Sequence, residues 1–276
     1  MSTGKTSRVE AWKRESVKRV CALGFVGVAG AALWAAEGPS ATNNLQAPSV
    51  NSGTTNVYVN SLGMRFVAVP GTRARFCIWE TRVSDYKVFC EATDHAHNDP
   101  DFSQGPSHPA VNVNWEDAQA FCRWLTGKER NEGRLGPAKK YRLPTDLEWT
   151  LAAGFSSATG STPEKRMRGE KIWPWGHYWP PQSGDGNYGP ALKVDDFAAT
   201  APVGSFKANA LGIFDLGGNV WEWCEDWYNE AQVTKTLRGG SFNDVLPGYL
   251  LTAYRFSGTM NLGNEDIGFR VVFAAE

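Results

Sequence analysis

The clearest hydrophobic pattern in the chain predicts an amphipathic helix over residues 114–127. Asn114 is suited to cap the start of this helix, and Gly127 is suited to end it. Four residues recur at i, i+3, i+4 and i+7, the spacing of one helical face: Ala118, Phe121, Cys122 and Leu125. Acidic Glu116 and Asp117 lie in the first turn, where their negative charges interact favourably with the helix dipole.

Two further helices have weaker patterns. One is expected to begin near Ser84, with an inner face formed by Tyr86, Phe89 and Cys90. The other follows the capping box of residues 145–148 and is expected to end near Gly154. From there to residue 172 the residues are polar and small, so we expect a mobile loop on the surface.

Short strand patterns surround these helices. Residues 63–71 are rich in strand-forming side chains and close with a Pro-Gly turn, and residues 75–79 are expected to return as a second strand. Further strands are expected at residues 141–144, 237–242, 250–256 and 268–273. Short strands, few helices and 29 glycines predict a loop-rich α+β domain without internal repeats.

The densest stretch is residues 215–227, with three tryptophans and four carboxylates around a Gly-Gly pair. Asp215 and Glu222 flank the turn, so two hard oxygens and the carbonyls between them could surround a calcium ion. An Asx-type turn between two core segments explains the same residues. The spacing of Trp221, Trp223 and Trp227 predicts a structured loop, and either a core seam or an aromatic binding surface accounts for it.

The N-terminus has the pattern of an export signal. Basic residues at 13, 14, 18 and 19 precede an apolar run over 20–34 and small residues at 35 and 36. We expect a signal peptide or an uncleaved anchor over 1–36, a flexible linker over 37–56 and one domain over 57–276. The protein is therefore expected to be exported: periplasmic, extracellular or held at the membrane by its N-terminus.

Charge and cysteines limit the possible partners. The net charge is −1 and no basic stripe alternates with aromatic residues, so we expect no nucleic-acid partner. Four cysteines follow the export signal: Cys77, Cys90, Cys122 and Cys224. They contain no Cys-x-x-Cys pair, and the sequence leaves both disulfides and buried free thiols open.

Two motifs resemble ligand sites without the context that such sites need. His95 and His97 have the spacing of a metal-binding pair, but the surrounding loop offers no evident third ligand. Three glycines at 184, 186 and 189 match a dinucleotide fingerprint, but prolines flank them and no strand–turn–helix pattern surrounds them. In the same loop, Asn187 and Asp195 are candidates to bind a second cation.

Taken together and in order, the motifs resemble those of the formylglycine-generating enzymes, or sulfatase-modifying factors. The matching segments are residues 63–71, 80–84, 108–115, 141–149, 173–176, 200–203, 218–223, 238–242 and 268–270. The resemblance implies an α+β fold, an elaborated C-type-lectin-like domain with little regular secondary structure.

The resemblance also implies two structural calcium sites. The first would consist of the side chains of Asp215 and Glu222 and the carbonyls of Gly218 and Val220. The second would consist of the side chains of Asn187 and Asp195 and the carbonyls of Tyr188 and Phe197. Relatives often have Asn at the position of Asp215, and the carboxylate here adds negative charge to the site.

The catalytic metal implied by the family is a different matter. Active members bind copper(I) through two cysteine thiolates after the Gly-Gly-Ser-aromatic motif, and by spacing these positions hold Asp244 and Tyr249. No cysteine follows Cys224. A carboxylate and a phenol are hard ligands, so we expect neither copper nor formylglycine generation. With four histidines in the chain, the three-histidine iron site of the related sulfoxide synthases is not expected either.

Two classes of function remain open. The first is a non-catalytic, calcium-stabilised module that binds a peptide, protein or glycan beside residues 238–254. Its candidate contacts, placed where the family's substrate groove would lie, are Asn243, Asp244, Tyr249, Tyr254 and Arg255. The second is an exported oxidase of the wider formylglycine-generating and nonheme iron superfamily, acting on a peptide or secreted substrate. The fold alone does not choose between them.

Overall fold

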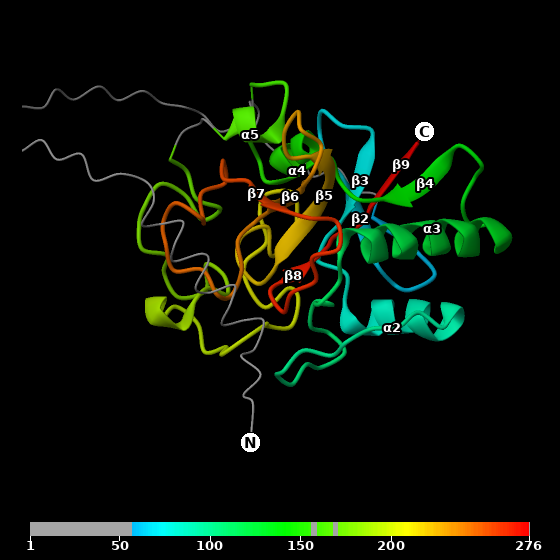
Figure 1. Ribbon diagram of the computed structural model, residues 1–276, viewed down its shortest axis with the longest axis horizontal. Helices are drawn as coiled ribbons and strands as arrows, with labels where there is room; N and C mark the ends of the chain where they lie inside the picture. The colour runs from blue at the N-terminus through cyan, green and yellow to red at the C-terminus, as the bar shows by residue number, and fades with distance from the viewer. Residues whose placement is uncertain (1–56, 156–158, 168–170, 276) are drawn as a thin grey trace, which may run out of the picture. The chain divides into compact units, whose positions relative to one another are not determined.

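The computed structural model describes residues 57–155, 159–167 and 171–275 (Figure 1). The expected export signal over 1–36 and linker over 37–56 lie outside the described residues. In the described part of the chain, no helix combines the length and apolar character needed to cross a membrane.

A five-stranded antiparallel sheet joins the two ends of the domain. Its order is β1 (Tyr58–Val59), β2 (Arg65–Ala68), β3 (Ala74–Cys77), β9 (Val272–Ala275) and β4 (Lys139–Arg142). Strands β2 and β3 confirm the hairpin expected from residues 63–79. The last strand lies between β3 and β4, as Figure 1 shows, so the sheet is complete only when the whole domain has been assembled.

A second sheet carries the tryptophan-rich stretch. Its order is β7 (Phe256–Gly258), β6 (Lys235–Arg238), β5 (Trp221–Trp227) and β8 (Ile267–Gly268), with only β5 and β8 parallel. The loop expected at residues 221–227 is thus wrong: the segment is a strand that buries Trp221 and Trp223. A shift of register between Trp223 and Trp227 accommodates the third indole.

The strand expected over residues 250–256 is also wrong, because β7 begins only at Phe256. Residues before it form turns, one of them closed by the bond from Tyr254 N to Leu251 O. The Arg255 side chain is turned into the interior, where it binds Asp146. These contacts replace the regular pairing that a strand would need.

Among the described residues, the helices are α2 (Val83–Thr93), α3 (Trp115–Asn131), α4 (Asp146–Ala152) and α5 (Pro163–Arg166), together with the 3₁₀ turn η1 (Pro190–Leu192). The expected capping is confirmed, since the Asn114 side chain accepts from Asp117 N and Thr145 from Glu148 N. The end expected at Gly127 is wrong. Helix α3 continues to Asn131, and in this last turn the Glu129 carboxylate accepts from the hydroxyls of Tyr58 and Tyr141.

The segment between Gly154 and residue 172 is not the free excursion that its polarity predicts, as far as it is described. It contains α5, and Arg166 at the end of that helix is buried. The Arg166 guanidinium lies 2.9 Å from the carboxylate of Asp146 at the start of α4. This ion pair could not be predicted from the polar composition of the segment, because an ion pair produces no hydrophobic periodicity.

The core lies between the helices and the sheets. Helix α2 packs on α3, and α3 packs on β4, whereas α4 contacts β5 and β6. The aromatic centre of the larger cluster contains Tyr86, Phe89, Phe121 and Phe269, with ring centroids 5.3 to 6.0 Å apart. The four cysteines at 77, 90, 122 and 224 are free thiols, so the alternative of disulfides is not realised.

Candidate functional site

The expected ligand groove begins at the turn that follows β6. Gly239 and Gly240 have φ angles of 100° and 81°, a conformation that side chains with a Cβ rarely adopt. The turn directs the chain to Ser241, whose backbone N and hydroxyl donate to Asp244 Oδ2 at 2.8 and 2.9 Å. Asp244 is therefore buried and faces inward.

A second carboxylate lies beside Asp244. Asp266 is fully buried, and its Oδ2 lies 3.3 Å from the same Ser241 hydroxyl. Burial, with a further contribution from the Asp266 charge, raises the pKa of Asp244 to about 7. Burial also raises the pKa of Asp266. The two carboxyl groups therefore flank one hydroxyl, and they offer hard oxygen atoms in place of sulfur.

Tyr249 and Tyr254 come together at the outer side of this region. Their ring centroids are 5.1 Å apart, and the Tyr254 ring lies 6.0 Å from that of Trp221. Both tyrosines are half-buried, and the nearby Leu246 is 44% exposed. Asn243 is exposed in the same loop. We call Asn243, Leu246, Tyr249 and Tyr254 the aromatic surface.

Arg255, the remaining expected contact, does not belong to the aromatic surface. The residue is 2% exposed, and its Nε lies 3.0 Å from Asp146 Oδ1. Arg166 and Arg238 bind the same carboxylate, so three guanidinium groups surround Asp146. Despite its burial, the charges of Arg238 and Arg255 and the bonds from the arginines lower the pKa of Asp146 to about 2. Arg255 thus holds α4 to the second sheet.

The first expected calcium site is a buried cluster of carboxyl groups around one guanidinium. Glu222 is fully buried, and both of its oxygens accept from Arg270, while Oε2 also accepts from Trp149 Nε1 at 3.0 Å. Asp215, with a φ of 57°, accepts from Gly204 N. Its pKa is raised to about 6, chiefly by burial.

Glu80 is a third carboxylate of this cluster, which the sequence motif did not reveal. One of its oxygens accepts from Asn219, and the other has no partner among the described residues although Glu80 is fully buried. Burial and the charges of Asp215 and Glu222 raise the pKa of Glu80 well above its usual range. Three carboxylates therefore face one guanidinium, and an added cation would relieve the imbalance. Glu222 would have to bind such a cation and Arg270 at the same time.

The second expected calcium site has a more open set of donors. Asn187 is 1% exposed, and its side-chain oxygen has no hydrogen-bond partner in the described structure. Its amide nitrogen fixes the orientation, because it donates to Ala199 O and to Asn219 Oδ1. Asp195 accepts from the backbone N of Tyr188 and of Phe197. An amide oxygen without a partner and a carboxylate are both ligands that calcium prefers.

The other candidate ligands are placed elsewhere. His95 contacts Asp117 at 3.1 Å and packs against Phe89. In residues 57–155, 159–167 and 171–275, no three His, Cys, Asp or Glu side chains form a group arranged to hold a metal ion. Any calcium at either expected site would therefore depend on carbonyl and amide oxygens as much as on carboxylates.

The sequence did not predict which charged residues would face the candidate site residues. Glu80, Asp266 and Arg270 are far along the chain from the carboxylates that they face, and each lies in an apolar or turn segment. A charged residue inside a strand-like apolar run, such as Glu80 after residues 75–79, was the available indication.

The arrangement of sheets and loops has counterparts among solved structures. The structure of PvdO from Pseudomonas aeruginosa aligns with a TM-score of 0.58 at 19% identity, over 80% of this chain and 98% of that one. Variable protein 1 of Treponema denticola aligns with a TM-score of 0.53 at 18% identity, over 82% and 100% of the two chains. These likenesses define the class of fold.

The sequence defines the family. The model of the sulfatase-modifying factor enzyme 1-like domain matches residues 35–275, and the chain belongs to this family. The chain is 31% identical over 188 residues to the formylglycine-generating enzyme of Streptomyces coelicolor, covering 62% of this chain and 54% of the relative. It is 32% identical over 177 residues to the inactive C-alpha-formylglycine-generating enzyme 2 of Bos taurus, covering 60% and 50%. The chain thus spans about half the length of the curated relatives it matches.

Proposed function

We propose that this chain is an exported, calcium-stabilised binding module of the sulfatase-modifying factor family, without formylglycine-generating activity. The observation that carries the proposal is the site of Asp244. A buried carboxylate that accepts two bonds from Ser241 occupies a position where a copper thiolate would be needed. The donor set at Asp244 and Tyr249 does not fit copper(I), which requires soft ligands.

The family contains precedents for both outcomes. One relative is named a formylglycine-generating enzyme and another is named an inactive one, at nearly equal identity to this chain. The family assignment therefore leaves activity open, and the chemistry of the donor atoms supports the inactive alternative.

A direct experiment compares copper(I) retention and peptide oxidation. The full chain is loaded with copper(I), and its metal content is measured before incubation with a Cys-x-Pro-x-Arg peptide. We expect no stoichiometric copper and no conversion of the cysteine to the aldehyde, with the Streptomyces coelicolor enzyme as the positive control. Retained copper or aldehyde product would overturn the proposal.

A matched variant strengthens this test. The double substitution Asp244→Cys, Tyr249→Cys restores two thiols at the positions in question. We expect this variant to retain copper(I) more strongly than the wild type, since thiolates are the ligands that copper(I) prefers. Equal retention by the two proteins would show that these positions are not where the metal binds.

The aromatic surface is the proposed contact for a peptide, protein or glycan. Half-buried tyrosines present a large apolar face and a hydroxyl at a small cost in conformational entropy, which suits recognition. Export rests on the pattern of residues 13–36, and N-terminal sequencing of the protein recovered outside the cytoplasm tests it. An uncleaved N-terminus recovered only in the cytoplasm would contradict export.

A further inference from the structure

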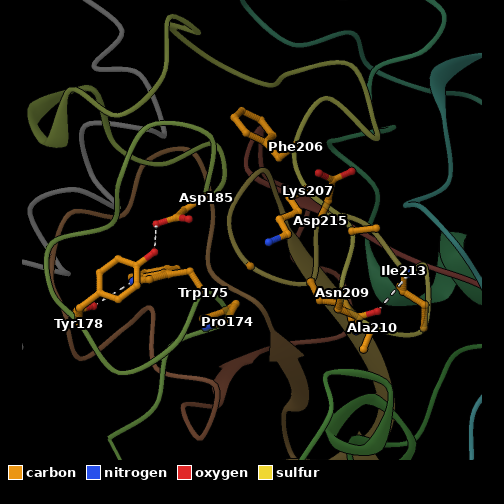
Figure 2. A pocket seen from close by; sticks show the side chains of 13 residues that line it. Pro174, Trp175, Tyr178, Asp185, Phe206, Lys207, Asn209, Ala210, Ile213 and Asp215 are labelled. Atoms are coloured by element: carbon orange, nitrogen blue, oxygen red, sulfur yellow. Dashed lines mark hydrogen bonds between the residues drawn. The ribbon is translucent and has the colours of Figure 1, made fainter. Parts of the chain in front are cut away.

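A cavity of about 390 Å³ lies between two loops that the aromatic surface does not include (Figure 2). One loop runs over residues 174–185 and the other over residues 206–217. The lining combines aromatic rings, an ammonium group and carboxylates, among them those of Trp175, Tyr178, Lys207 and Asp185. A cavity of this volume has the size of a small-molecule site.

The first loop forms a fixed aromatic wall. The Trp175 ring stacks on that of Trp173 at 6.1 Å and packs edge-on against buried Tyr188 at 5.0 Å. Its indole N–H donates to Tyr178 O at 3.0 Å, which fixes the position of the next ring along the loop. This wall is therefore preorganised for the apolar part of a ligand.

Asp185 is held in place on the same wall with one oxygen left over. Its Oδ2 accepts from the Tyr178 hydroxyl at 2.8 Å and from Gln182 N at 2.7 Å. In the described structure, no hydrogen bond engages Oδ1. The Asp185 carboxylate thus has a defined orientation and retains capacity to accept from a ligand.

Lys207 supplies the opposite charge from the second loop. Figure 2 shows Lys207 across the cavity from Trp175 and Tyr178, with its ammonium group directed into the space between the loops. No hydrogen bond or ion pair with another described residue engages this group. Lys207 and Asp185 therefore line one cavity with opposite charges and do not neutralise each other.

We propose that this cavity binds a small zwitterion, an α-amino acid with an apolar side chain. The ligand carboxylate pairs with Lys207, its ammonium group pairs with Asp185 Oδ1, and its side chain packs on the ring of Trp175. A purely cationic ligand would face Lys207, and a purely anionic one would face Asp185, so a molecule with both charges matches the lining best. Asp215 also lines the cavity, but its side chain is buried and its Oδ2 accepts from Gly204 N.

Titration calorimetry on the full chain tests the charge pattern. The probes are L-phenylalanine and L-leucine, with phenethylamine, 3-phenylpropionate and glucuronate for comparison. We expect at least one amino acid to bind with a dissociation constant below about 1 mM, and the amine and the acid to bind at least about tenfold more weakly. Glucuronate binding without amino-acid binding, or no binding by either amino acid, would overturn the proposal.

Charge-removing variants locate the site. Lys207→Met and Asp185→Asn are each expected to weaken amino-acid binding at least about tenfold. Asn at 185 keeps an oxygen for Tyr178 and Gln182, so the loop is preserved. Lys87→Met is the matched control, because Lys87 is exposed on α2 and pairs only with the exposed Glu91 among the described residues. Equal affinity in wild type and Lys207→Met, or equal losses in Lys207→Met and Lys87→Met, would refute this location.

Discussion

Arg270 and Glu222 form a fully buried ion pair, with Arg270 Nη2 2.6 Å from Glu222 Oε1. Glu222 belongs to β5 in the four-stranded sheet. The same guanidinium donates to Cys77 O, at the end of β3 in the five-stranded sheet, and to Phe214 O. The pair therefore connects the two sheets next to the first expected calcium site.

Removing Arg270 should destabilise the domain strongly. Arg270→Met leaves the Glu222 carboxylate buried without its cation and leaves two backbone carbonyls without a donor. The loss of one partner of a buried pair costs about 3–5 kcal/mol in the free energy of unfolding. Urea unfolding of the full chain measures this change.

The control for this prediction is Arg73→Met, since Arg73 is exposed in the turn between β2 and β3. We expect a change of less than about 0.5 kcal/mol there. A loss below about 1 kcal/mol in Arg270→Met would mean that the pair is not a principal link between the sheets.

Calcium should raise stability through the site at Asn187 and Asp195. At a free calcium concentration a hundred times the dissociation constant, one site adds about 2.7 kcal/mol. Asp195→Asn removes the charge and keeps only one of the two oxygens, so either Tyr188 N or Phe197 N loses its acceptor. We therefore expect this variant to be less stable than the wild type in chelator by about 1 kcal/mol, and to lose the calcium-dependent rise in melting temperature.

The neighbouring substitution Asp196→Asn is the control, because Asp196 is exposed. It should keep the full response to calcium. Calcium content of the full chain should be two ions in the wild type and one in Asp195→Asn. If the wild type gains no stability from calcium, the proposal of structural calcium is wrong.

Asp244 should make stability fall as pH rises from about 4 to 7. Its pKa is raised to about 7 in the folded chain, above the value near 3.9 of an unfolded aspartate. The folded state therefore binds more protons in this window, and the stability from the protonated form is lost up to about pH 7. The contribution is about 1.4 kcal/mol per pH unit at most.

Asp244→Asn removes this titration while keeping an oxygen for Ser241. Relative to the wild type, the variant should gain stability as pH rises from 4 to 7 and stay level above that. Chemical unfolding in chelator at several pH values gives the difference directly. A difference that does not vary with pH would show that Asp244 is charged throughout.

Local signals in the sequence predicted local structure. The side chains of Asn114 and Thr145 cap helices at the positions expected, because capping depends on residues three apart. The position of β9 between β3 and β4 could not be predicted in this way. That pairing joins segments separated by most of the domain, and periodicity contains no information on which strands meet.

For the candidate site too, the sequence predicted residues of local motifs but not their partners from distant segments. Motif order led us to expect Asp244 and Tyr249 at the groove, but it gave no indication that Asp266, from a later turn, contacts the same Ser241 hydroxyl as Asp244. Arg255 was expected beside Tyr254 at the groove, yet adjacent residues in a turn point in different directions. Arg255 points inward because it pairs with the buried Asp146. Asp146 lies on α4, far from Arg255 in the sequence, so local patterns could not predict this contact.

The aromatic surface should lose its ligand when Tyr249 is truncated. A displayed peptide library and a glycan array are the probes, and affinity for the enriched sequences or glycans is then measured with purified variants. We expect Tyr249→Ala and Leu246→Ala to weaken binding at least about tenfold, as for central aromatic and apolar contacts. Val233→Ala, at a residue 64% exposed between β5 and β6, should bind like the wild type. Ligands whose affinity is the same in all three variants would place recognition away from the aromatic surface.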